Sequence, residues 1–270
     1  MTSPAAPIGG TAATLDDQRA GPALLVKVPE VLVWFWIVKV ATTALGESVS
    51  DYLVNRYDPV LVVVVGFVAF AAALAWQFRV PRYVAWVYWS TALMVSTFGT
   101  MAADVAHVGL GIPYAVSTAL SSAVLAATFV VWFRTEQTLS IHSISTTRRE
   151  AFYWATALVT FALGTAVGDL TAVTLHLGYL SSGILFGIVF ALAGIAWRVG
   201  LNPVVAFWWA YIATRPFGAS FADWFAKPTA SGGLGYGQGP VSLVLAVVIV
   251  TGVTYLAVSR IDDPNGSQRS

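Results

Sequence analysis

Apolar residues fall in eight long blocks along the chain, separated by short polar connections. Most blocks have roughly the 20 residues that an α-helix needs to cross a bilayer core about 30 Å thick. Short segments of alternating polarity, which are typical of β-strands, are absent from the pattern. The pattern predicts an all-α membrane protein with eight transmembrane helices, at about 31–54, 59–78, 84–107, 113–134, 150–175, 179–199, 204–226 and 239–259.

The composition strengthens this prediction. Of the 270 residues, 57% are hydrophobic and 10% are charged, and the mean hydropathy is +0.75. These values exclude an ordinary soluble domain and make the lipid bilayer the expected partner. The absence of Cys excludes disulfides, Cys-ligated zinc and thiol catalysis. The net charge of +1 gives no reason to expect nucleic acid as a partner.

Every second block shares one sequence frame. The four copies are FWIVKVATTALGESVSD (35–51), YWSTALMVSTFGTMAAD (88–104), YWATALVTFALGTAVGD (153–169) and FWWAYIATRPFGASFAD (207–223). Each copy runs aromatic residue, Trp, nine residues, Gly, four residues, Asp, without a gap. The frame residues are Trp36, Trp89, Trp154 and Trp208; Gly46, Gly99, Gly164 and Gly218; and Asp51, Asp104, Asp169 and Asp223.

This frame divides the chain into four tandem two-helix repeats, at about 28–83, 84–139, 148–203 and 204–260. Because every copy crosses the membrane in the same direction, the repeats should be pseudo-symmetric about the membrane normal. We expect residues 1–27 and 261–270 to be disordered tails on either side of one membrane domain, 28–260. The first tail lacks a basic start followed by a clean apolar run, so it is not interpreted as a signal peptide.

With these frames, the chain resembles a family of bacterial membrane proteins built of four tandem repeats. Each repeat of that family has two transmembrane helices and a characteristic Trp, and the family is catalogued as a domain of unknown function. The resemblance also rests on the VPE…K…T…GE…D run of the first repeat, and it covers about 28–260. It implies a fold and a membrane location, and it supplies no established activity. The fourth repeat departs from the plain pattern in Arg215-Pro216 and in SGGLGYGQG (231–239), which we interpret as a flexible loop.

Basic residues predict the orientation in the cell (inner or plasma) membrane. Two of them, Arg56 and Lys227, lie in the connections on one side. The tails and the alternate connections hold ten, which by the positive-inside rule places both termini in the cytoplasm. These ten are Arg19, Lys27, Arg79, Arg82, Arg134, Arg148, Arg149, Arg198, Arg260 and Arg269.

The ionisable residues of the frame helices share one face. At about 100° per residue, Lys39, Glu47, Arg215 and the frame Asp and Gly residues fall within an arc of about 140°. Because ionisable groups are costly in lipid, this arc should face the interior of a bundle lined by the four frame helices. The glycines would allow these helices to approach closely, and the Trp residues are interpreted as packing or interfacial anchors.

The frame also predicts depth. Asp follows Trp by fifteen residues, or about 22 Å of helix, so the Trp residues should lie toward the cytoplasm and the Asp residues toward the outside. Thr100 and Thr165 occupy the level of Glu47 in repeats two and three. If the bundle closes, Lys39 can reach Asp223, and Arg215 can reach Glu47 or Asp51.

These charges suggest a cation site. Five acids, the four frame Asp and Glu47, face two internal bases, Lys39 and Arg215. A bound cation or bound protons should offset the excess. Carboxylate ligands favour Mg, Ca or Mn, and His107 and His176 are candidate ligands for a transition metal. No organic cofactor is expected.

Two functions remain open from the sequence. The first is a secondary transporter or exporter of a cation, coupled to a metal or to protons through the acid cluster. The alternative is a non-transporting sensor or structural membrane protein in which the same charges form internal salt bridges. An enzyme is not expected, because no nucleophile with a base, no HExxH motif and no phosphate-binding Gly loop appears.

Overall fold

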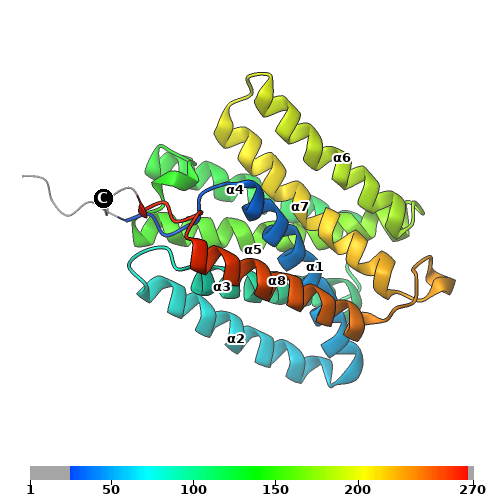
Figure 1. Cartoon of the computed structure of the whole chain (residues 1–270). Coiled ribbons are helices and arrows are strands. Elements are labelled where there is room, and N and C mark those ends of the chain that lie inside the picture. The colour runs from blue at the N-terminus through cyan, green and yellow to red at the C-terminus, as the bar shows by residue number, and fades with distance from the viewer. Residues whose placement is uncertain (1–24, 267–270) are drawn as a thin grey trace, which may run out of the picture.

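The computed structural model describes residues 25–266 and is all-helical within them (Figure 1). The prediction of eight long helices is confirmed, and their limits lie within a few residues of the apolar blocks. Short π-helical turns, Val105–Gly109 and Leu170–Thr174, extend two of the helices. The helices are α1 (Val33–Arg56), α2 (Pro59–Arg79), α3 (Ala85–Asp104), α4 (Tyr114–Glu136), α5 (Thr147–Asp169), α6 (Tyr179–Arg198), α7 (Pro203–Ala226) and α8 (Gln238–Ser259).

Several helix starts follow from local sequence. Asp58 accepts a hydrogen bond from the backbone N–H of Leu61 and precedes Pro59, the first residue of α2. Asn202 caps α7 in the same way, again before a proline. A capping side chain followed by proline satisfies free N–H groups and presets the first helical φ, so these connections define sharp boundaries.

The four frame helices form a closed inner ring, in which α1 packs on α3, α3 on α5, α5 on α7, and α7 on α1. The frame Gly residues make this ring tight. Each packs against the residue seven positions after Trp in the next repeat, and an added Cβ would come within 3.0 Å of it. The pairs are Gly46 with Ser96, Gly99 with Phe161, Gly164 with Arg215, and Gly218 with Thr43.

The other four helices form an outer layer. Each packs mainly on the inner helix of the following repeat: α2 on α3, α4 on α5, α6 on α7, and α8 on α1. Their outward faces expose large apolar side chains, such as Val60, Leu120, Ile188 and Val247. Five segments are long and apolar enough to cross a membrane: 59–79, 114–136, 147–174, 179–198 and 238–259. All four outer helices are among them.

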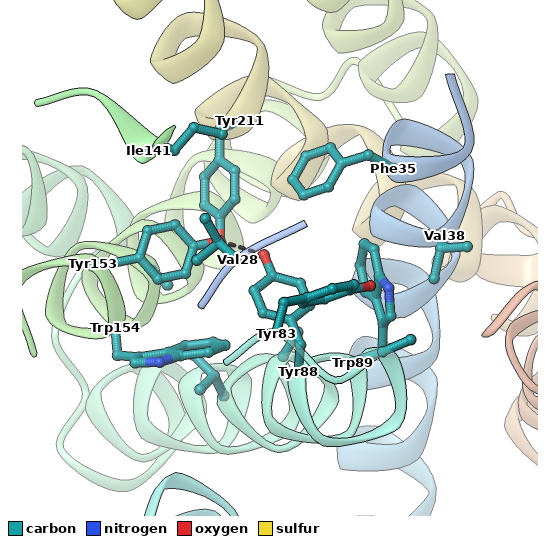
Figure 2. Close-up of a cluster of buried hydrophobic side chains, with 14 of the residues drawn as sticks. Val28, Phe35, Val38, Tyr83, Tyr88, Trp89, Ile141, Tyr153, Trp154 and Tyr211 are labelled. Carbon is teal, nitrogen blue, oxygen red and sulfur yellow. Dashed lines mark hydrogen bonds between the residues drawn. The ribbon is translucent and has the colours of Figure 1, made fainter. Parts of the chain in front are cut away.

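An aromatic core fills the half of the ring where the frame helices begin (Figure 2). Trp89, Trp154 and Trp208 are buried, whereas Trp36 is half-buried. Tyr88 and Tyr153, which precede two of these tryptophans, are each 1% exposed and their hydroxyl groups are hydrogen-bonded to each other. In this structure the frame Trp residues therefore act mainly in packing.

Both described ends of the chain meet at this same end of the bundle, which we call the terminal end; the opposite one is the far end (Figure 1). The N–H of Glu30 donates to the carbonyl of Asp262, and Asn265 exchanges hydrogen bonds with the backbone of Val26.

The predicted tails differ from the structure in part. Asp262 and Asn265 are each 2% exposed, and Lys27 is 5% exposed. These residues are ordered because hydrogen bonds and ion pairs hold them against the bundle. Residues 1–24 and 267–270 of the predicted tails lie outside the described part of the chain.

Candidate functional site

A buried arginine lies at the centre of the inner ring. The side chain of Arg215, on α7, is fully buried, and its Nη2 lies 2.7 Å from Oε2 of Glu47 on α1. The same nitrogen donates to Thr165 Oγ1 at 2.7 Å and to the hydroxyl of Thr100. Its Nη1 donates to the carbonyl of Thr43 at 3.2 Å. All four inner helices thus contribute to one charge-assisted hydrogen-bond network.

The repeat frame positions this network. Glu47, Thr100 and Thr165 each stand eleven residues after their Trp, and Arg215 stands seven after its own. The fourth residue at position eleven, Ala219, is small. Gly164 makes room for the Arg215 side chain. The predicted contact of Arg215 with Glu47 is present, and the threonines supply hydroxyl groups at the expected level.

A second charge cluster lies at the far end, between repeats one and four. Lys227, just beyond α7, pairs with Asp51 of α1, and its Nζ lies 3.6 Å from Oδ1 of Asp223. Gln238, the first residue of α8, donates to Asp51 Oδ2 at 2.8 Å. Sequence analysis missed Lys227 as a partner because it appeared only as a loop residue. The signal was its position four residues after Asp223, one helical turn away.

The two remaining frame acids, Asp104 and Asp169, are half-buried, and neither takes part in the ion pairs of the described residues. Ser50 lies 3.5 Å from an oxygen of Asp104. Each acid is the last residue of its α-helix and is followed directly by a π-helical turn, Val105–Gly109 or Leu170–Thr174. Such turns widen a helix locally and are frequent at functional sites.

The predicted partner of Lys39 is wrong. Lys39 is 1% exposed, and its Nζ lies 4.2 Å from the ring centroids of both Phe161 and Tyr211, in cation–π geometry. It forms none of the ion pairs of the described residues. The expected partner Asp223 lies too far along the bundle axis from Lys39, toward the opposite end. Lys39 is three residues after its Trp and Asp223 fifteen after its own, a difference of about 18 Å of helix.

A preformed metal site is not found. Among residues 25–266, no three His, Asp or Glu side chains are grouped so as to hold a metal ion. His107 lies against Tyr114, with ring centroids 4.3 Å apart and the rings tilted by 60°, and His176 is exposed in a connection with φ of 56°. The carboxylates are instead spread over four helices or engaged by basic side chains.

A buried polar cluster at the terminal end was also missed by sequence analysis. Lys27 pairs with Glu150, which is fully buried, and Gln77 donates to the same carboxylate at 2.8 Å. Nearby, the hydroxyl of Tyr83 donates to Asp262. Burial raises the pKa of the Asp262 carboxyl, and the Tyr83 hydrogen bond opposes that rise. No repeated frame position marks these residues, so the sequence carried little signal for them.

Together these features define a class: an all-helical protein of four tandem repeats, whose inner ring encloses charged groups. A family model described as a repeat of unknown function (DUF347) matches residues 34–83, 87–138, 152–199 and 206–262. The chain belongs to this family, and the resemblance and the fourfold division predicted from the Trp-Gly-Asp frames are confirmed. No curated protein and no solved structure matches the chain.

Proposed function

We propose that the protein is an integral membrane protein with all eight helices in the bilayer. The support is the distribution of polarity. The outer layer exposes apolar side chains over nearly its whole length, which suits lipid and not water. The helices α1, α3 and α7 fall outside the set of apolar spans, but their charged residues, such as Lys39, Glu47 and Arg215, are buried in the ring.

The terminal end faces the cytoplasm in this proposal, because it carries most of the basic residues. The chain has no Cys, so single cysteines can be labelled without background. Ser231→Cys lies exposed at the far end and Thr147→Cys exposed at the terminal end. An impermeant maleimide added to intact cells should label only the former. Labelling of Thr147→Cys alone would reverse the orientation.

Within this membrane protein, the function that the geometry supports best is secondary transport of a cation. The observation that carries it is the pair Asp104 and Asp169. They are half-buried acids at the far end, outside the ion pairs of the described residues, and a π-helical turn follows each. Acids in this position attract cations to the outer mouth of the ring, while the Arg215–Glu47 pair closes its centre. Passage would require that central pair to open.

The test is flux into proteoliposomes with Mn²⁺, Mg²⁺, Ca²⁺ and protons as probes. Asp104→Asn combined with Asp169→Asn should reduce flux at least about tenfold while the protein remains folded. Asp58→Asn is the matched control. It removes an exposed far-end carboxylate, and Asn retains the cap of α2. If the wild-type protein passes none of these ions, the transport proposal is wrong.

The alternative is a non-transporting protein in which the charges only hold the ring together. One observation favours it: Arg215 is fully buried and bonded to groups on all four inner helices, as expected of a structural centre. In that case Asp104→Asn and Asp169→Asn should leave every flux unchanged, and Glu47→Gln should reduce only the yield of folded protein.

A further inference from the structure

Lys39 is the second cation inside the ring, and its surroundings differ from those of Arg215. Arg215 has a carboxylate and hydroxyl groups around it, whereas the Lys39 amine lies against two aromatic rings. The guanidinium carbon of Arg215 is 5.3 Å from the centroid of Phe161, and the Lys39 amine is 4.2 Å from the centroid of that same ring. Two positive charges against one ring, both buried, repel each other more strongly than they would in water.

No acidic side chain on α1 or on the helices packed around it pairs with Lys39. On its own helix, Glu47 is engaged by Arg215. The acids of α3, α5 and α7 all lie at the far end; they are Asp104, Asp169 and Asp223. The helix α8 contains no Asp, Glu, Lys, Arg or His. The remaining charges of α5 and α2, Arg148, Arg149, Glu150 and Arg79, lie at the terminal ends of those helices.

On the terminal side of Lys39, phenol groups follow one another through the aromatic core. The rings of Tyr211 and Tyr153 have centroids 6.2 Å apart, and those of Tyr153 and Tyr88 are 6.3 Å apart. The hydroxyl groups of Tyr88 and Tyr153 are hydrogen-bonded, and Figure 2 shows the Tyr211 ring directed toward the same place. All three tyrosines are 1% exposed.

The chemistry of these groups is suited to moving a proton. A phenol hydroxyl both donates and accepts, so it can receive a proton on one side and release its own on the other. A lysine ammonium can lose a proton and become neutral, whereas an arginine in a protein stays charged. Loss of one proton from Lys39 would remove the repulsion between the two cations against Phe161. The step is a proton transfer alone, with no change in oxidation state.

We propose that Lys39 is a proton-binding site of the transport cycle, exchanging its proton with the terminal end through the hydroxyl groups of Tyr211, Tyr153 and Tyr88. The proposal rests on the transport function above and identifies the proton as the coupling ion. When Lys39 is neutral, Arg215 is free of its repulsion and stays with Glu47. When Lys39 is protonated, the repulsion loosens Arg215 and favours opening of the centre. The proton then leaves Lys39 through the open centre toward the far end while a cation enters, so the proton and the cation move in opposite directions.

The experiment follows Mn²⁺ and lumenal pH together in proteoliposomes that contain a pH-sensitive dye. An Mn²⁺ gradient across wild-type protein should drive protons in the opposite direction. Lys39→Arg keeps the positive charge and the cation–π contacts but cannot release a proton, so proton movement should fall on the order of tenfold or more. Tyr153→Phe removes one hydroxyl and should slow it similarly. Tyr255→Phe removes an exposed phenol of the outer layer and should change nothing.

The outcomes separate the two proposals. If Mn²⁺ moves without protons, or if folded Lys39→Arg moves protons at the wild-type rate, the proton site is wrong and cation transport stands. If an imposed membrane potential drives protons through wild type but not through Lys39→Arg, while none of the metal ions moves, the proton site stands and metal transport is wrong. Movement of neither Mn²⁺ nor protons overturns both.

Discussion

Repeats one and four differ from repeats two and three in the chemistry that they place on the same frame. Repeats one and four supply the opposite charges that meet, in the pairs Glu47 with Arg215 and Asp51 with Lys227. Repeats two and three supply hydroxyl groups at the centre, and their acids at the far end lie outside the ion pairs of the described residues. The same backbone arrangement therefore carries two different sets of polar contacts.

The location of the pairs explains this difference. Consecutive repeats are joined by a connecting segment of the chain, whereas repeats one and four are joined by packing alone, of α7 and α8 on α1. Repeats one and four must close the ring although their paired residues lie 168 and 176 positions apart. Two ion pairs cross this α1–α7 seam, from Arg215 to Glu47 and from Lys227 to Asp51.

The largest expected effect comes from breaking the central pair. Arg215→Met leaves the Glu47 carboxylate buried without its cation, and stability should fall by about 3–5 kcal/mol. Combining it with Glu47→Gln removes the unpaired charge and should restore most of that loss. Unfolding in detergent measures both variants. Arg134→Met, at an exposed position of α4, is the control and should stay within about 0.5 kcal/mol of wild type. Equal losses in the single and double variants would show that the pair is not what closes the seam.

A smaller effect is expected from crowding one contact of the ring. Gly164→Ala places a methyl group against Arg215 and Pro216, and overpacking of this kind costs about 1–3 kcal/mol. Gly194→Ala, on the outer helix α6, meets nothing within 4 Å and should be neutral or stabilising by up to about 1 kcal/mol. Thermal unfolding of the two variants compares them directly. A stable Gly164→Ala protein would contradict close packing of α5 on α7.

The fold was predictable because two independent signals agree, the eight apolar blocks and the Trp-Gly-Asp frame. The contact of Arg215 with Glu47 was also accessible, since helical geometry places both on the inner arc at similar depth. Lys39 shows where this reasoning failed: its charge suggested an acidic partner, but depth excluded Asp223 and aromatic faces took its place. Lys227 and Lys27 were missed because loop conformation, which has no period in sequence, decides where they reach.

At the terminal end, the hydrogen bond from Tyr83 to Asp262 holds the segment after α8 against the connection between α2 and α3. Tyr83→Phe leaves a buried carboxylate without its donor, at a cost of about 1–2 kcal/mol near neutral pH. Because burial raises the pKa of Asp262 above 3.8 and the Tyr83 bond opposes the rise, the variant should have a still higher pKa. The folded state of the variant then binds a proton more readily than that of the wild type. Its loss of stability relative to wild type therefore shrinks as pH falls through this pKa and grows as pH rises. Unfolding midpoints of wild type and variant across acidic pH measure the change, and a deficit independent of pH would exclude Asp262 as its source.

The smallest expected effect separates the two kinds of frame acid. Asp51→Asn removes the partner of Lys227, and because that lysine is 29% exposed the loss should be at most about 1 kcal/mol. Asp104→Asn removes a half-buried charge that lies outside the ion pairs of the described residues, so stability should be unchanged or slightly higher. The two substitutions are chemically identical and lie at the same frame position, so each is the other's control in a thermal unfolding experiment. Under the transport proposal their effects on flux are reversed, because Asp104 is the acid available to a cation. A larger stability loss for Asp104→Asn than for Asp51→Asn would mean that the acids of repeats two and three hold the structure together as well, and the distinction between the two pairs of repeats would fail.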